Sequence, residues 1–523
     1  MKKALATALL LGMAVIGYGQ KASDKAQITY GENFKAAKRL NFYQMMGEQD
    51  GKMYGLFMKA GMRGASYSIG RVNASLEMEA LEEVPFSVKG EDGTFAGYVM
   101  FAGKMYLFTS IAIKRSNEND VYAQALNLKS LKPEGPVTKV GTLEYKTAMD
   151  MMTARVQFAI SDDGSKLVIY NQKLPSKSEK ATLEVQVYNT DMQQLWQKEI
   201  SLPYESDLFR LENVVLDNSG DAYVLGKVLA SAKEANKLDP EGRYMILAYD
   251  AKGEAIGEFQ ADFEDKYISS MIVKTDDPDH LFCAGFYRGG EKAGTSGTIV
   301  AKINRTTKEV QTLGVEEFSL DFITQDLPQA QAKKAKKQAD KGKVVGLRGV
   351  KTRELIQRED GGFLLIGEQE WTESIMTIIQ GQQYPGIAFY FMDIPVVSIS
   401  PEGNVEWATK IPKHQRSEND FGQFSGYGML AKKDKLYFIF NDNPKNLPFS
   451  SDNKLKEMTP GDAALAIAVI DAKGNIKRES LLGSKAGEVV ARPNTSFDIN
   501  DSELVFFGSK GKDNSFIKMT VAD

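Results

Sequence analysis

Histidine and cysteine are nearly absent from this chain of 523 residues. Its two histidines are His280 and His414, and its single cysteine is Cys283. One cysteine excludes an intramolecular disulfide, and two histidines cannot form the histidine cluster that zinc sites commonly use. The sequence also contains no Walker loop, no GxSxG nucleophile elbow and no HExxH motif. We therefore predict no cofactor and no metal site, and we expect Cys283 to be a core thiol.

Long apolar segments are also missing, except at the N-terminus. There, two lysines precede the uncharged run Ala4–Ile16, and the small residues Gly17 and Gly19 stand just before Gln20. This order is typical of a secretory signal peptide over residues 1–19, cleaved near Gly19-Gln20. The run is shorter than the roughly 20 apolar residues that cross a bilayer. We therefore expect a periplasmic or secreted protein without a membrane span.

Neither sign of charge is in clear excess. The chain has 65 Lys and Arg residues against 69 Asp and Glu residues, so the formal net charge is −4. A basic surface over the whole molecule is therefore lacking, and no nucleic-acid partner is expected. Hydrophobic residues make up 42% of the chain, which is enough for a large core, and the charged fraction of 26% argues against wholesale disorder.

What the chain does contain is a repeated hairpin. An apolar strand, a tight turn and a more polar strand occur at Ala463–Leu482, Ile246–Phe259 and Val396–Ile411. A second, shorter turn alternates with this hairpin along the chain. It lies near Asp50, Gly103, Asp163, Ser219, Asp277, Asp360, Lys433 and Asn500. Four antiparallel strands per unit predict an all-β, single β-propeller over residues 20–523, with eight four-stranded blades and seven as the alternative.

The last repeat unit is incomplete. Its third strand, Ser515–Val521, ends the chain, whereas the segment Ala26–Tyr30 precedes the first unit and has no partner of its own. Pairing these two segments would cover an edge that a propeller otherwise leaves open. We therefore predict that the ring is closed by an N-terminal strand.

The long segments of the chain fall into one topological class. In a four-stranded blade, the loops between second and third strands and the links between blades share one face of the ring. Seven insertions belong to this class: Asn171–Thr182, Leu229–Arg243, Arg288–Gly297, Thr372–Met392, Asn441–Ala464, Ser319–Gly349 and Lys413–Gly422. We call this side the insertion face, and we expect binding there because rigid scaffolds place function on such loops.

Polar and aromatic residues gather in three of these insertions. The segment Lys413–Asp420 and the residues around Asp442 offer groups for an anion, a sugar or a divalent cation, although turn chemistry also accounts for most of the Asn and Asp residues. The apolar segment Thr372–Met392 is either a partner surface or, as the favoured interpretation, two strands packed on a neighbouring blade. The candidate binding residues are Trp371, Tyr384, His414, Arg416, Asp420, Asn441 and Asp442.

A basic helical insertion is predicted at about residues 319–349. Its Ala-, Gln- and Lys-rich sequence has good helix propensity. Lys333, Lys334, Lys336 and Lys337 lie in this insertion. They are candidates to contact lipid phosphates or an acidic partner, and the alternative is a solvated helix without a binding role.

Short motifs resemble three groups of propellers. SPEGNVEWATKI and NTDMQQLWQKEI resemble the Gly-x-x-x-Trp turn of pyrroloquinoline-quinone-type propellers, in which the tryptophan docks one blade onto the next; Trp407 and Trp196 occupy that position here. ISDDGSKLVIY resembles the repeat of TolB-like propellers. FMDIPVVSISPEGNVEWATKIPK and KLYFIFNDNPKN are similar to uncharacterised exported β-propeller-like proteins of Bacteroidota. These resemblances imply a cell-envelope location and no known activity or cofactor.

The sequence therefore favours an exported, monomeric, non-catalytic binding or scaffold protein. Its insertion face is expected to hold a cell-envelope protein or a glycan. The alternative is a polysaccharide-active hydrolase or lyase with carboxylates at the central channel, because carboxylates far apart in sequence can converge.

Overall fold

The computed structural model describes residues 21–521 apart from 23–24, 62–63, 114–115, 146–155, 175–178, 232, 234–241, 262–265, 276, 291–292, 328, 380, 448–454 and 483–488. The predicted signal peptide, residues 1–19, and its cleavage position near Gly19-Gln20 lie outside the described residues. No helix within the described residues is long and apolar enough to cross a membrane.

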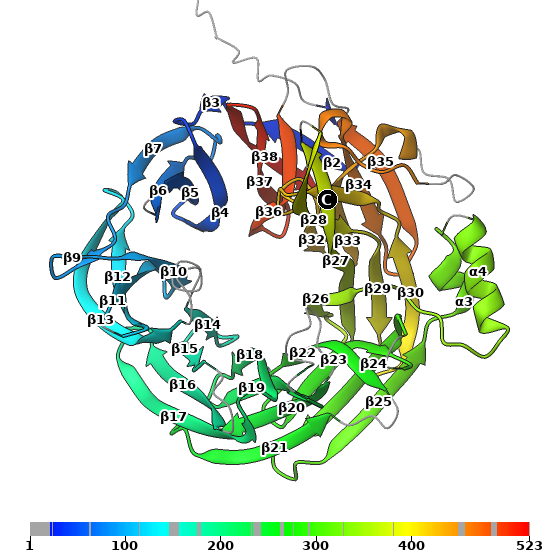
Figure 1. Ribbon diagram of the computed structural model, residues 1–523, viewed down its shortest axis with the longest axis horizontal. Coiled ribbons are helices and arrows are strands. Elements are labelled where there is room, and N and C mark those ends of the chain that lie inside the picture. The colour runs from blue at the N-terminus through cyan, green and yellow to red at the C-terminus, as the bar shows by residue number, and fades with distance from the viewer. Residues whose placement is uncertain are drawn as a thin grey trace, which may run out of the picture.

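Eight antiparallel sheets of four or more strands follow one another around a ring in the described residues (Figure 1). Blade 1 consists of β4 (Leu40–Gln49), β5 (Lys52–Gly61), β6 (Gly64–Val72) and β7 (Met78–Glu83). Blade 2 consists of β10 (Thr94–Phe101), β11 (Lys104–Ala112), β12 (Glu118–Asn127) and β13 (Lys132–Glu144). Blade 3 consists of β14 (Gln157–Ile160), β15 (Lys166–Gln172), β16 (Lys180–Asn189) and β17 (Gln194–Glu205). Blade 4 consists of β18 (Phe209–Leu216), β19 (Ala222–Leu229), β20 (Gly242–Tyr249) and β21 (Ala255–Ala261).

The second half of the ring carries the insertions. Blade 5 consists of β22 (Tyr267–Lys274), β23 (His280–Arg288), β24 (Thr295–Asn304) and β25 (Val310–Glu317). Blade 6 consists of β26 (Val350–Gln357), β27 (Phe363–Ile379), β28 (Gln382–Phe391), β29 (Ile394–Ile399), β30 (Val405–Ile411) and β31 (Gln415–Glu418). Blade 7 consists of β32 (Gly428–Lys432), β33 (Lys435–Asp442), β34 (Ala464–Ile470) and β35 (Ile476–Leu482). Blade 8 consists of β36 (Val490–Asn500), β37 (Glu503–Lys510), β38 (Asp513–Val521), β2 (Ala26–Tyr30), β1 (Lys21–Ala22) and β3 (Phe34–Lys35).

The remaining elements lie in links and loops. A two-stranded ribbon of β8 (Ser87–Val88) and β9 (Glu91–Asp92) follows blade 1. Helices α3 (Leu320–Thr324) and α4 (Gln329–Ala339) lie between blades 5 and 6, as the predicted helical insertion requires. The short 3-10 helices η1 (Pro444–Asn446) and η2 (Pro460–Asp462) lie between β33 and β34.

The core of the protein lies between the blades. The buried apolar side chains form eight clusters in the described residues, and each cluster joins two neighbouring blades. One of them joins blade 8 to blade 1, where Phe42 stacks on Phe507 with ring centroids 4.2 Å apart. Because the middle strands of a blade are covered on both faces, they are continuously apolar: all seven residues of β34 are buried. This arrangement is that of a β-propeller.

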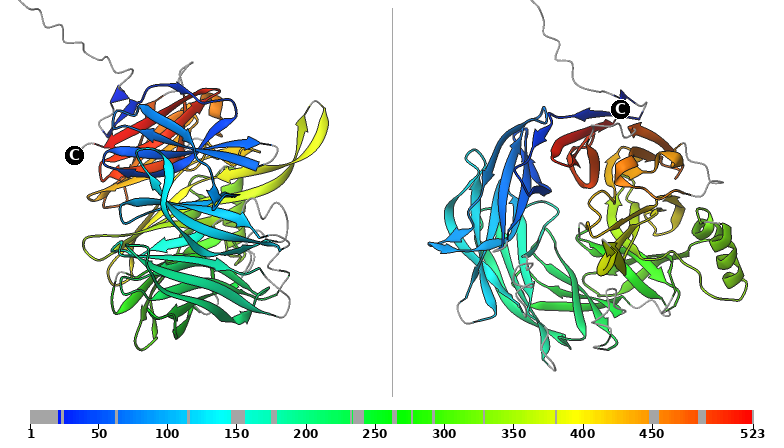
Figure 2. Two further views of the ribbon diagram at one scale, coloured as in Figure 1. Left: turned by 90° about the vertical axis from the view of Figure 1, so that its left-hand side faces the viewer. Right: turned by 45° about the horizontal axis from the view of Figure 1, so that its top comes forward.

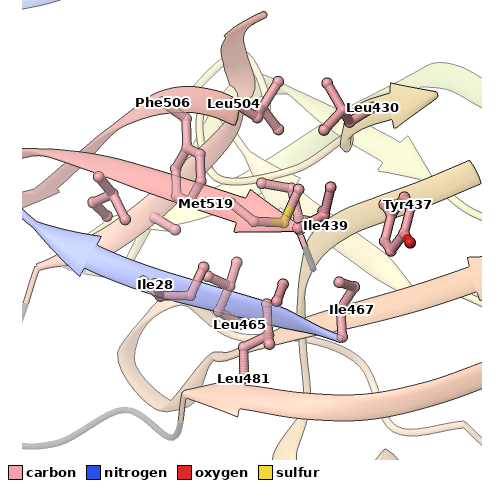
Figure 3. Packing of buried hydrophobic residues seen from close by; sticks show 14 of the residues in the cluster. Ile28, Leu430, Tyr437, Ile439, Leu465, Ile467, Leu481, Leu504, Phe506 and Met519 are labelled. Carbon is pink, nitrogen blue, oxygen red and sulfur yellow. The ribbon is translucent and has the colours of Figure 1, made fainter. Parts of the chain in front are cut away.

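The last blade takes its fourth strand from the N-terminus. β2 pairs with β38 from Ala26 opposite Val521 to Tyr30 opposite Ile517. Ile28 on β2 is completely buried and packs in the cluster between blades 7 and 8 (Figure 3). The N-terminal segment therefore covers the edge of β38, as the incomplete last unit predicted.

The tight turns of the repeated hairpin contact the two tryptophans that carry the sequence resemblance. Asp471 accepts hydrogen bonds from the backbone N–H groups of Lys473 and Asn475, which fixes the turn after β34. Trp407 of blade 6 donates its indole N–H to the carbonyl of Ala472 in this turn (2.9 Å). Gly474 has φ +80° and lies against the Trp407 ring, so a Cβ there would stand 2.7 Å from the ring. Trp196 of blade 3 lies in the same way against Gly253 of blade 4. Each tryptophan therefore docks its blade onto the next.

Candidate functional site

Four insertions meet around one pocket on the insertion face. They are the α3–α4 segment, the base of the β27–β28 hairpin, the link after β30 and the loop between β33 and β34. The pocket has a volume of about 470 Å³. It is lined by Ile323, Asp326, Leu327, Gln331, Gly346, Leu347, Arg348, Gln369, Trp371, Met392, Asp393, Lys413, His414 and Leu455. Both apolar and charged side chains face this space, so it can contact a partner of mixed polarity.

One wall of the pocket belongs to the α3–α4 insertion. Ser319 caps α3 by accepting a hydrogen bond from the N–H of Phe322, and Phe322 and Ile323 are buried against blades 5 and 6. Helix α4, in contrast, buries only Ala335. The predicted basic residues Lys333, Lys334, Lys336 and Lys337 lie on its exposed surface, and Lys336 is 3.5 Å from Asp321. The insertion is therefore docked through α3 and presents α4 to solvent.

A buried ion triad holds this insertion on blade 6. The Lys410 ammonium lies 3.2 Å from Asp326, in the α3–α4 segment, and 3.1 Å from Asp393, between β28 and β29. The Lys410 side chain is completely buried. Burial raises the pKa of the Asp326 carboxyl, and Lys410 opposes this rise. Because the ammonium lies between the two carboxylates, the triad clamps the α3–α4 segment to blade 6.

A second buried network lies beside it. The Lys413 ammonium is 2.7 Å from Glu368 and donates a hydrogen bond to Gln415 (2.9 Å). Glu368 also accepts from Arg353 (2.9 Å), which in turn pairs with Glu370. Burial lowers the pKa of Lys413, and the Glu368 carboxylate opposes this shift. The network joins β26, β27 and the link after β30, so it fixes the base of the β27–β28 hairpin.

The structure places the predicted binding residues in three different environments. Trp371 and His414 line the pocket. Asn441 and Asp442 are buried: the Asn441 amide donates to the carbonyls of Phe424 (2.9 Å) and Ala491 (2.7 Å). Asp442 pairs with Arg478 and accepts from the amide of Asn446 (2.8 Å). These two residues hold the loops of blade 7, and their binding role has no support from this geometry.

The other three predicted residues lie along the β27–β28 hairpin and the link behind it. Arg416 donates to the Tyr390 hydroxyl (3.2 Å) and pairs with Glu418 (2.5 Å). Asp420 accepts from the backbone N–H of Gly422 and so belongs to a turn. Tyr384 lies near the end of the hairpin and is 44% exposed. Of these three residues, only Tyr384 is in the exposed class.

Trp371 is enclosed by its neighbours. Its ring stacks on Tyr390, directly opposite on β28, with centroids 4.9 Å apart and an angle of 10°. The Arg348 guanidinium lies over the same ring at 4.4 Å and is also 2.8 Å from Glu373. This layered contact stiffens the base of the hairpin, so the ring acts as a support for the projecting strands.

The β27–β28 hairpin projects away from the ring, which differs from the prediction that it packs on a neighbouring blade (Figure 2). Ser374–Met392 contains no charged residue. Its exposed side chains include Met376 (59%) and Ile378 (68%), and Phe421 of the adjacent link is 83% exposed. Packing on a blade would have buried these side chains, so the hairpin presents exposed apolar side chains on this face.

Sequence reasoning missed Lys410, Glu368, Asp393 and Asp326. A lysine near the end of a strand and an acid in a loop read as solvated surface residues, because no local pattern marks them as buried. The described residues contain no group of three His, Cys, Asp or Glu side chains suited to a metal ion. Cys283 is in the core, where burial raises the pKa of its thiol to about 12, so it is not a reactive nucleophile.

No protein family matches this chain, and no match was found among curated proteins. Among solved structures, it is similar to prolyl oligopeptidase B from Galerina marginata, with 8% identity over 90% of this chain and 55% of that one and a TM-score of 0.40. The chain thus spans about half the length of that peptidase. It is also similar to the β-propeller domain of the Trilobed protease from Pyrococcus furiosus, with 10% identity over 75% of this chain and 99% of that one and a TM-score of 0.30.

A third similar structure is a protein of unknown function from Bacteroides caccae, with 11% identity over 71% of this chain and 94% of that one and a TM-score of 0.27. Similarities at this level carry no argument about activity. The chain's own sheet topology defines its class: it is an all-β propeller protein.

Proposed function

We propose that this protein is an exported, non-catalytic binding or scaffold protein that holds a cell-envelope protein or glycan on its insertion face. One observation carries the proposal: an exposed hairpin without charge from Ser374 to Met392 stands on a base in which buried lysines pair with carboxylates. Such a base supplies rigidity, and such a hairpin supplies apolar contact area, which together suit binding. The sequence resemblance to exported propeller-like proteins of Bacteroidota supports the proposed location.

The proposal is tested by site-specific photo-cross-linking in cells that express the protein natively. A photoreactive amino acid replaces Tyr384 on the hairpin or, as the matched control, Lys252 in a tight turn on the opposite face. We expect one discrete cross-linked partner from position 384 and none from position 252. Digestion of the adduct with a protease or a glycosidase then tells a protein partner from a glycan. Equal adducts from both positions, or none from position 384, would contradict the proposal.

A second candidate function has one observation in its favour. Glu354 on β26 and Asp498 on β36 lie on innermost strands of blades 6 and 8 (Figure 1). Desolvation by the surrounding strands raises the pKa of Glu354, Asp498 raises it further, and Lys274 opposes the rise. Burial also raises the pKa of Asp498. A carboxyl with a raised pKa is what a polysaccharide hydrolase or lyase needs as its general acid. Release of reducing ends from uronate polysaccharides by the native protein, but not by Glu354→Gln, would favour this alternative.

The raised pKa of Glu354 also predicts how stability depends on pH. The folded state binds this proton more tightly than the unfolded state, so the contribution of Glu354 falls as pH rises above its ordinary pKa of 4.5. The glutamine side chain does not ionise in this pH range, so Glu354→Gln lacks this loss of stability. Glu354→Gln is therefore expected to be more stable than the native protein at pH 7.5, with the difference vanishing below pH 4.5. Urea denaturation at several pH values checks this. A difference between the two proteins that is the same at pH 4 and pH 7.5 would contradict this prediction.

A further inference from the structure

One edge of strand β27 is paired with another strand along only part of its length. β26 pairs with this edge from Gln369, which lies opposite Val350, to Phe363, which lies opposite Gln357. The last backbone hydrogen bond there runs from the N–H of Glu370 to the carbonyl of Gly349 (2.9 Å). Gly349 has φ +63°, and the preceding chain leaves the sheet at this point. Beyond it, the segment Thr372–Ile379 pairs only with β28 in the part of the chain that the structure describes.

The open side presents a regular row of backbone groups. In an antiparallel strand, alternate residues direct both their N–H and C=O groups to the same side. Because Glu370 faces the β26 side, Thr372, Ser374, Met376 and Ile378 face it too. The open segment Thr372–Ile379 exceeds the usual strand length of about five to six residues. It can therefore accept a complete additional strand.

The side chains of this segment lack the protection that exposed edges normally carry. Natural proteins protect such edges with lysine, proline, bulges or a covering loop. The segment contains no proline, and its single charged residue, Glu373, lies next to its base and pairs with Arg348. Met376 and Ile378 lie on the same face as Ile387 of β28, which is 45% exposed. An unprotected edge beside an exposed apolar face is a site for pairing.

The chemistry of the edge selects among possible occupants. A lipid surface would cover the apolar side chains but leave the backbone N–H and C=O groups of the edge without partners in hydrocarbon, which is costly. An added protein strand satisfies both. Near the base of the edge, Gln331 of α4 lines the same pocket as Trp371, and the exposed, positively charged Lys333 and Lys334 follow on α4. The occupant should therefore carry acidic residues at the end that lies near α4.

We propose that the open edge of β27 over Thr372–Ile379 binds an extended, uncharged segment of a partner protein as an additional β-strand, with acidic residues of that segment beside α4. This inference rests on the proposed binding function and specifies its partner. Main-chain hydrogen bonds supply affinity in this mode, and Met376 and Ile378 supply side-chain contacts.

The test uses the full chain and a fluorescein-labelled peptide of alternating threonine and valine that ends in three glutamates, with binding measured by fluorescence anisotropy. Met376→Pro is expected to weaken binding about tenfold or more, because proline removes an edge donor without touching the β27–β28 pairing. Gln383→Lys, on the same face but on β28, is the matched control and should bind as the native protein does. A peptide N-methylated at alternate residues should not bind, since it cannot make the backbone hydrogen bonds.

Each other occupant gives a different result. Equal binding of the N-methylated peptide, equal binding by Met376→Pro, or no peptide binding at all would overturn the strand proposal. Binding to vesicles of phosphatidylcholine and phosphatidylglycerol that depends on Met376 would assign the edge to lipid instead. A dimer in light scattering that Met376→Lys converts to a monomer would assign it to a second copy of this chain. A specific cross-link from position 384 that survives in Met376→Pro would retain the proposed binding function while overturning strand addition.

Discussion

Replacement of Lys410 by methionine is expected to lower the free energy of unfolding by about 3–5 kcal/mol, because it leaves Asp326 and Asp393 buried without their cation. The completely buried ammonium is within 3.2 Å of both carboxylates. Methionine fills a similar volume, so packing loss contributes little. Urea denaturation at pH 7.5 measures the effect.

The control for this variant is an exposed ion pair of similar composition. The Lys351 ammonium lies 3.1 Å from Glu370, and its side chain is more than half exposed. Lys351→Met should cost less than about 1 kcal/mol. If the two variants lose the same stability, the buried triad does not have the role that its geometry indicates.

The pH dependence of the Lys410 variant identifies the cause. Without Lys410, the pKa of the buried Asp326 carboxyl rises further in the folded state, so the folded state binds a proton that the unfolded state has released. The penalty is therefore present at neutral pH and shrinks as pH falls toward the ordinary Asp value of 3.8. The triple variant Lys410→Met, Asp326→Asn, Asp393→Asn should recover part of the loss at pH 7.5. A penalty that is the same at all pH values would indicate a packing defect instead.

Removal of the N-terminal strand is expected to have the second large effect. Deletion of Lys21–Tyr30 exposes the edge of β38 and uncovers the cluster between blades 7 and 8. The single change Ile28→Ala should already cost about 2–5 kcal/mol, because it removes a fully buried side chain from that cluster. The complete deletion should cost more and should promote association through the exposed edge.

Thermal unfolding and light scattering check these two variants. Gln27→Ala, on the same strand but only half-buried, is the control and should cost less than about 1 kcal/mol. An unchanged unfolding midpoint after deletion of the strand would mean that β2 does not hold the ring closed.

Much of the fold could be predicted because it repeats. The alternation of two turn types gives the strand order within each blade, and an apolar segment such as Ala464–Ile470 reads as a strand covered on both faces. The last unit lacks a fourth strand and the segment Ala26–Tyr30 has no unit of its own. The pairing of the two could therefore be predicted, because an open strand edge is costly. The strand order alone also predicted that the insertions share one face of the ring.

The candidate site could be predicted only in outline. Trp371 and His414 were expected on the insertion face and do line its pocket, and Tyr384 is exposed on the hairpin. Asn441 and Asp442 looked like surface ligands, but the structure buries them among partners that lie far away in the sequence, such as Ala491 and Arg478. Local sequence cannot distinguish a solvated aspartate from one that meets an arginine 36 residues later.

The sequence by itself thus determined the repeating architecture, its closure and the face on which the insertions lie, because these follow from strand order and apolar pattern. Only the tertiary structure decided which charges are buried and which apolar residues are exposed. Lys410 and Lys413 became internal because Asp326 of the α3–α4 segment and Glu368 of β27, both distant in sequence, meet them. The hairpin of Met376 and Ile378 stayed exposed because the described chain packs no element against its apolar face. Burial depends on long-range packing, which no local pattern contains.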